Sequence, residues 1–239
     1  MQRRIALRIA VIATTVAVVS SGFVGGTLTA SAGNLAGAPS AASTAGSFVC
    51  TRVLGYSQTR QWYLDAPDFE QVVGNDQWEL LWRKGAGMKW QNPSYVGWTD
   101  PVASPCVERS GDPDRVLLTI GASKCVDSSC KATEITKAVA TIRLKYPNVA
   151  QILLQPLVGG PGHALCYTTG GLLIRATYLH PIIDEAIGAT VGGDTLAGAS
   201  PEVRTCSDYS NDAGSGHFVR AARGIIGRMI GEFYVGLAV

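Results

Sequence analysis

Residues 48–59 read Phe-Val-Cys-Thr-Arg-Val-Leu-Gly-Tyr-Ser-Gln-Thr, an apolar run that leads directly into a turn containing glycine and serine. Short runs of this kind, ending in glycine or a polar loop, are typical of buried strands. The residues that follow, 60–73, have a composition compatible with a helix. This order of strand, tight turn and helix predicts the first unit of an α/β fold, with Ser57 at the point where the strand gives way to the helix.

The same alternation continues along the chain. Four further apolar runs predict strands at residues 78–82, 115–120, 151–157 and 195–199, and helical periodicity predicts helices at 132–146, 175–187 and 218–233. Pro147 should end the first of these helices, and Pro181 should start or kink the second. The pattern predicts a five-stranded, mostly parallel sheet covered on both faces, which is a three-layer α/β/α sandwich. In such sheets, functional residues gather in loops at the carboxyl ends of the strands.

The first 32 residues have the features of a secretory signal peptide. Three arginines lie within the first eight residues, an apolar run follows at 9–19, and Ala30-Ser31-Ala32 offers small residues for cleavage. The apolar run is shorter than the roughly 20 residues that span a bilayer. We therefore expect a secreted, extracellular protein, with an uncleaved N-terminal anchor as the alternative.

The remainder of the chain divides into a linker and one domain. Residues 33–47 are mostly Ala, Gly, Ser, Thr and Pro, which predicts a flexible tether, and residues 48–239 suit a single core. Cleavage would remove three of the 20 basic residues and none of the 18 acidic ones, leaving a net charge of −1. This balance does not favour nucleic acid as a partner. We expect a monomer with no membrane span after cleavage.

All six cysteines lie in the predicted domain, and an even number in an exported chain indicates disulfide bonds. Cys125 and Cys130 flank a four-residue loop, which favours a local bridge between them. Spacing leaves the pairing of the other four open. Joining neighbouring segments would give Cys50–Cys106 and Cys166–Cys206.

Ser57 and His217 are the candidate catalytic pair. A serine at a strand-to-helix turn has an exposed hydroxyl close to helix-start amides that can stabilise an oxyanion, although the same position also suits a helix N-cap. His217 follows a polar loop that holds Asp208 and Asp212 and stands directly before the last predicted helix. A serine nucleophile needs an imidazole to take its proton and a carboxylate to orient that imidazole. The pattern predicts such a site, with a solvated histidine as the alternative for His217.

The order of these blocks resembles that of the SGNH (GDSL-like) hydrolases, which are esterases and lipases on a flavodoxin-like α/β/α sandwich. The first block of that family is a strand ending in G-D-S-x-T, and this chain has Gly55-Tyr56-Ser57-Gln58-Thr59. The last block, D-x-x-H before a final helix, places its histidine at His217. Its aspartate would fall on Gly214, whereas Asp212 lies five residues before the histidine. The resemblance covers most of residues 48–239 as an order of blocks.

The resemblance also implies where an oxyanion would be held. The second block of the family contributes a glycine amide, which falls within Gly85-Ala86-Gly87, and we place it at Gly87 rather than Gly85. The third block contributes an asparagine, and the matching position here is Ser123. A serine hydroxyl can donate a hydrogen bond, but it is shorter than the asparagine side chain.

His163 and Trp90 are candidate substrate-binding residues. His163 lies in a glycine-rich loop at the expected functional edge, although a solvent-facing ring is the alternative. Trp90 begins a polar-aromatic loop that either presents a stacking surface or fills the core. The H-x-x-C spacing of His163 and Cys166 offers too few ligands for zinc, so no metal site is expected. His180, four residues before Asp184, is expected to make only a local contact on a helix face.

The resemblance thus implies a secreted serine esterase or lipase that cleaves carboxylic esters. Ser57 would be the nucleophile, His217 the general base and then acid, and Asp212 or a backbone carbonyl would orient the ring. The substrate would be a small-molecule or polysaccharide-linked ester, and no cofactor is expected. One alternative is a non-catalytic exported domain that binds carbohydrate or cell-wall polymer through its aromatic loop. A further alternative is a hydrolase that uses Asp208 or Asp212 with His163.

Overall fold

The computed structural model describes residues 48–74, 76–108 and 111–236. The predicted signal peptide, 1–32, and the predicted linker, 33–47, lie outside the described residues. Among the residues that are described, no helix combines the length and the apolar character needed to cross a membrane.

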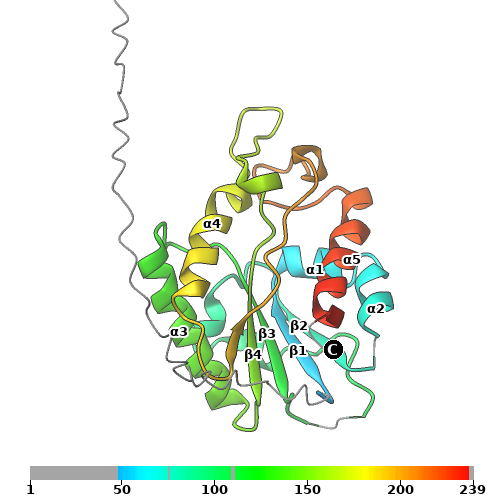
Figure 1. Cartoon of the computed structure of the whole chain (residues 1–239), viewed down its shortest axis with the longest axis vertical. Helices are drawn as coiled ribbons and strands as arrows, with labels where there is room; N and C mark the ends of the chain where they lie inside the picture. The colour runs from blue at the N-terminus through cyan, green and yellow to red at the C-terminus, as the bar shows by residue number, and fades with distance from the viewer. Residues whose placement is uncertain (1–47, 75, 109–110, 237–239) are drawn as a thin grey trace, which may run out of the picture. The chain divides into compact units, whose positions relative to one another are not determined.

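Five parallel strands form one sheet in the order β2-β1-β3-β4-β5 (Figure 1). The strands are β1 (Thr51–Gly55), β2 (Trp78–Trp82), β3 (Arg115–Ile120), β4 (Gln151–Pro156) and β5 (Thr195–Ala197). β1 pairs with both β2 and β3, so that Leu54 lies opposite Leu81 on one side and Leu118 on the other. The predicted five-stranded parallel sheet is confirmed. Its order reverses between β1 and β3, which is where parallel α/β sheets usually bind ligands.

Helices pack in two groups. α1 (Ser57–Tyr63), α2 (Asp68–Val73) and α5 (Arg220–Gly236) contact one another, as do α3 (Ser128–Lys145) and α4 (Arg175–Gly188). Figure 1 shows the two groups on opposite sides of the sheet, which is compatible with a three-layer α/β/α sandwich. The strands between them are buried on both faces, and for this reason they read as continuous apolar runs.

The helices depart from their predictions in three places. The helix expected at 60–73 is broken into α1 and α2 with Pro67 at the start of the second, because a proline disfavours helical geometry in the residue before it. α4 runs through Pro181 without starting there. α3 begins four residues before the predicted 132, where the side chain of Asp127 accepts the backbone N–H of Cys130 at 2.8 Å and caps the helix.

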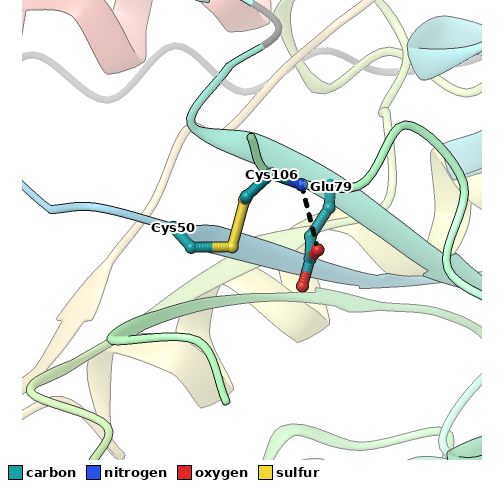
Figure 2. Close-up of side chains that lie close together, drawn as sticks. All are labelled: Cys50, Glu79 and Cys106. Carbon is teal, nitrogen blue, oxygen red and sulfur yellow. Dashed lines mark hydrogen bonds between the residues drawn. A yellow bond between two sulfur atoms is a disulfide. The ribbon is translucent and has the colours of Figure 1, made fainter. Parts of the chain in front are cut away.

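The six cysteines form three disulfides, Cys50–Cys106, Cys125–Cys130 and Cys166–Cys206. The predicted local bridge is confirmed, and the remaining cysteines pair between neighbouring segments. Figure 2 shows that the first bridge lies beside Glu79 of β2, whose Oε2 accepts the backbone N–H of Cys106 at 3.3 Å. The two sulfur atoms are bonded to each other, so this grouping has no thiolate to offer a metal ion. It lies near the start of β1, at the opposite end of that strand from Ser57.

Candidate active site

Ser57 is the first residue of α1 and lies two residues after Gly55, the last residue of β1. Tyr56 stands between them as the N-cap of the helix. The buried side chain of Thr59 holds this turn in place. Thr59 Oγ1 accepts the N–H of Tyr56 at 3.3 Å and lies 2.7 Å from Oγ1 of Thr119 on β3. A side-chain carbon on Gly55 would lie 2.6 Å from Thr59, so the turn requires glycine at this position. The glycine and the threonine of the block therefore hold Ser57 at the carboxyl end of β1.

Ser57, His217 and Asp212 form one chain of hydrogen bonds. Oγ of Ser57 lies 2.8 Å from Nε2 of His217, and Nδ1 of the same ring lies 2.7 Å from Oδ2 of Asp212. Within this chain the hydroxyl can donate to one ring nitrogen while the other donates to the carboxylate. The structure thus brings together the three residues predicted to be catalytic, in the order nucleophile, base and orienting acid.

No protein-family model matches this chain, and no curated protein matches it either. The hydrogen-bonded arrangement of Ser57, His217 and Asp212 therefore carries the functional interpretation.

The Asp212 carboxylate is held in its ionised form by hydrogen bonds. Its partial burial acts to raise its pKa, but hydrogen bonds from Ser210, Ser215 and His217 outweigh this effect and lower the pKa below its usual value. The hydroxyl of Ser210 donates to Oδ1 of Asp212, and its backbone N–H donates to the carbonyl of His217 at 2.8 Å. An ionised carboxylate at this position keeps the proton of the neutral imidazole on Nδ1 and leaves Nε2 free to accept the serine proton.

The loop between Asp212 and His217 adopts an unusual backbone that makes their contact possible. Ala213, Gly214 and Gly216 all have positive φ angles, of 52°, 69° and 76°. A side-chain carbon on Gly214 would lie 2.6 Å from the carbonyl oxygen of Leu173, so this position has neither the conformation nor the space for another residue. The loop is thereby folded tightly enough for a carboxylate five residues away to reach the ring.

Two buried glutamines connect α1, the helix that begins at Ser57, to the loop that holds His217. Gln58 donates from Nε2 to the carbonyl of Gly216 at 2.8 Å, and its Oε1 accepts the N–H of Val158 at 2.9 Å. Gln61 accepts the N–H of Phe218 at 2.8 Å. These contacts fix both sides of His217 relative to α1. Sequence reasoning did not identify either glutamine, and the only available signal was a polar side chain at an inward-facing position beside Ser57.

Gly87 lies next to the loop that follows β3, close to the nucleophile turn. A side-chain carbon on Gly87 would lie 2.7 Å from the carbonyl oxygen of Ala122. One on Gly121 would lie 2.9 Å from the Tyr56 ring and 3.2 Å from Cα of Gly87. Gly87, the loop that follows β3 and Tyr56, which is the residue before Ser57, therefore meet at one place.

Ser123 is engaged in a partly buried hydrogen-bond network with Lys131 and Glu134. Nζ of Lys131, which is fully buried, donates to Oγ of Ser123 at 2.5 Å and to Oε2 of Glu134 at 2.9 Å. The Ser123 hydroxyl then donates to the same Glu134 oxygen at 2.6 Å. An ammonium group can only donate, so the serine proton is used by the carboxylate. Ser123 in this conformation is not available as an oxyanion donor.

The Lys131 ammonium sits in an environment unfavourable to charge. Burial lowers its pKa, and the hydrogen bond and attraction of Glu134 oppose that effect only in part. A third donation, to the carbonyl of Gly121 at 3.4 Å, extends the network to the backbone of the same loop. Lys131 therefore stabilises the loop at residues 121–123 through its hydrogen bonds to Gly121 and Ser123.

The structure places Trp90 and His163 in different surroundings. Trp90 has no exposed surface and packs edge-to-face against Tyr95 and Trp98. The expectation of an exposed stacking surface therefore fails for Trp90, because its ring fills the core beneath the loop. The His163 side chain is 58% exposed, and its Nδ1 lies 3.3 Å from Oε1 of Glu202. It makes no hydrogen bond to the Ser57–His217 pair.

Proposed function

We propose that this protein is an exported serine hydrolase of the SGNH type that cleaves carboxylic esters. The observation that carries the proposal is that one imidazole, His217, bonds the Ser57 hydroxyl at 2.8 Å and the Asp212 carboxylate at 2.7 Å. Triads of this kind are recognised by geometry rather than by sequence position. Three disulfides and the predicted signal peptide support export. The position of the serine at the switch point of a parallel sheet supports the SGNH assignment.

In the first half of the proposed reaction, Oγ of Ser57 attacks the carbonyl carbon of the ester while Nε2 of His217 takes the hydroxyl proton. Asp212 stabilises the resulting imidazolium through its contact with Nδ1. The carbonyl oxygen becomes an oxyanion, and in this proposal the N–H groups of Ser57 and Gly87 donate hydrogen bonds to it. The amide of Ser57 suits this role because the first N–H groups of a helix have no intrahelical partner.

Collapse of this tetrahedral intermediate breaks the bond to the alcohol. The leaving oxygen takes the proton from Nε2 of His217, and an acyl group remains on Ser57. A water molecule then attacks the acyl carbon while His217 accepts its proton. The second intermediate collapses, the proton returns to Oγ of Ser57, and the carboxylic acid is released.

The non-catalytic alternative keeps one supporting feature, which is Ser123 at the position where the resembled family has asparagine. Its expected binding surface is weakened, because Trp90 is buried and Tyr95 and Trp98 pack against it. An intact hydrogen-bonded triad also favours chemistry over simple binding.

The proposal is tested with the exported, disulfide-bonded protein, a fluorophosphonate probe and a short-chain aryl ester. Wild type is expected to be labelled and to hydrolyse the ester, whereas Ser57→Ala should lose both properties because the attacking oxygen is gone. Ser94→Ala is the matched control, since Ser94 is exposed and its hydroxyl makes no contact with the triad. A wild-type protein that is neither labelled nor active would overturn the proposal, as would full activity in Ser57→Ala.

A further inference from the structure

Three side chains from separate parts of the chain meet outside the triad. His163 lies on a 3-10 turn after β4, His180 lies on α4, and Glu202 follows β5. One potential ligand atom from each lies within 4.8 Å of the other two. The ring centroids of the two histidines are 5.7 Å apart. The H-x-x-C spacing of the sequence did not show this group, because its members are 17 and 39 residues from His163.

The backbone holds His163 and Glu202 in place relative to each other. The Glu202 carboxylate accepts the N–H of Gly162 at 2.6 Å and the N–H of His163 at 3.2 Å. Two of the three residues of this turn have positive φ angles, 58° for Gly162 and 61° for His163. A positive φ is uncommon for a residue other than glycine. Here it places the imidazole beside the carboxylate that its own amide contacts.

His180 supplies the observation that points to a missing partner. The side chain is 1% exposed, its Nε2 lies 3.2 Å from Oγ of Ser200, and its buried Nδ1 has no hydrogen-bond partner. Buried polar atoms are almost always satisfied. The ring is also closely packed, because a side-chain carbon on Gly159 would lie 2.5 Å from its Cγ. An imidazole that uses one nitrogen for a hydroxyl contact and keeps the other unpaired has the arrangement of a metal-ligating histidine.

We propose that His163, His180 and Glu202 form a binding site for a divalent transition-metal cation, with Zn²⁺ as the best fit. Two imidazoles and one carboxylate are a donor set that zinc accepts, and the fourth position would be taken by water. Ligand atoms around tetrahedral zinc lie roughly 3.3 Å apart. Nδ1 of His163 and Oε1 of Glu202 are already 3.3 Å apart, and all three ligand atoms lie within 4.8 Å of one another. The cation would satisfy the buried nitrogen of His180 and the charge of Glu202.

Such a cation would stabilise the edge of the sheet that carries the triad. It would join the loop after β4 to α4 and to the segment after β5. Val158, one residue before this loop's first glycine, donates its N–H to Gln58 beside the nucleophile. The predicted role is structural, and binding can be measured without any reference to ester hydrolysis.

The test is a calorimetric titration of the exported, chelator-stripped protein with ZnCl₂, followed by metal analysis and melting curves. Wild type is expected to bind one Zn²⁺ per chain and to melt at a higher temperature when loaded. His163→Gln should weaken binding at least tenfold and abolish the thermal shift. This side chain is exposed, so the variant should fold, and a metal-free melting temperature equal to that of wild type checks this. Glu202→Gln provides a second ligand variant.

His217→Gln is the matched control, because it removes the histidine of the triad and leaves the proposed site intact. It should bind Zn²⁺ like wild type. The absence of stoichiometric binding by wild type would overturn the proposal, as would unchanged binding by both His163→Gln and Glu202→Gln. Loss of binding in His217→Gln alone would also overturn it, because the cation would then belong to the triad.

Discussion

Oδ2 of Asp212 lies 2.7 Å from Nδ1 of His217, although the two residues are five positions apart in an irregular loop. The contact depends on a loop with three positive φ angles, at Ala213, Gly214 and Gly216. The hydroxyl of Ser210 also donates a hydrogen bond to the Asp212 carboxylate. The loop therefore folds back on itself so that the carboxylate reaches the ring.

Asp212→Asn is expected to reduce kcat for ester hydrolysis by about 10³ to 10⁴, because a neutral amide does not stabilise the imidazolium or fix the ring tautomer. Steady-state kinetics with an aryl ester measure this loss. Asp208→Asn is the matched control, since Asp208 accepts the N–H of Thr205 and makes no contact with His217. If Asp208→Asn lost activity and Asp212→Asn kept it, the orienting carboxylate would be Asp208.

The stabilisation provided by ionised Asp212 should disappear in acid. Its folded-state pKa lies below the usual value of about 3.9, so it contributes stability above that pH and loses it as the pH falls through the folded value. Asparagine resembles the protonated side chain. The melting temperature of wild type should thus exceed that of Asp212→Asn at pH 7, and the difference should shrink below about pH 4. A difference that stays constant across this range would show that ionisation of Asp212 does not contribute.

The fold could be predicted from the sequence because its elements are marked by local patterns. The strands at Trp78–Trp82 and Arg115–Ile120 have the predicted bounds, since a strand buried on both faces is a continuous apolar run whatever its neighbours are. Pro67 was the local signal for the break between α1 and α2, and the prediction at 60–73 did not use it.

The candidate site was predictable only in part. Ser57 and His217 stand at strand and helix ends, which sequence patterns locate. The residues that hold them in register, such as Gln58 with Gly216, are 158 positions apart, and no local pattern reports such a pair. The burial of Lys131 could not be predicted either, because a lysine in a helix is normally solvated. The exposure of Trp90 could not be predicted, because a polar-aromatic loop can have the same sequence whether its tryptophan is buried or exposed.

Gly87→Ala should lower kcat by roughly ten- to a hundredfold, because the added carbon would meet the carbonyl of Ala122 at 2.7 Å and displace the proposed oxyanion amide. Gly85→Ala is a close control. Gly85 has a positive φ of 65°, similar to the 47° of Gly87, but nothing lies within 4 Å of its added carbon. Kinetics of both variants separate backbone strain from displacement of the amide. An equal loss in Gly85→Ala would argue against a specific role for Gly87.

Lys131→Met should reduce the free energy of unfolding by about 1 to 3 kcal/mol, because Glu134 and Ser123 would lose their buried partner while the methionine fills similar space. Lys137→Met on the same helix removes an exposed lysine and should change stability by less than about 0.5 kcal/mol. Urea unfolding curves measure both. Equal stability of the two variants would mean that the network contributes no net free energy.

Removing the Cys166–Cys206 bridge should destabilise the protein more than removing Cys125–Cys130. In the chain-entropy description, a bridge between residues 40 apart contributes about 4 kcal/mol and one between residues five apart about 2 kcal/mol, because the longer loop restricts the unfolded chain more. Unfolding of the two double-alanine variants under non-reducing conditions tests the order. Removing the Cys166–Cys206 bridge is also expected to lower kcat. Cys206 lies six residues before Asp212, and the bridge ties that segment to the loop after β4. Equal losses of stability would show that native-state contacts around each bridge, rather than loop length, determine its contribution.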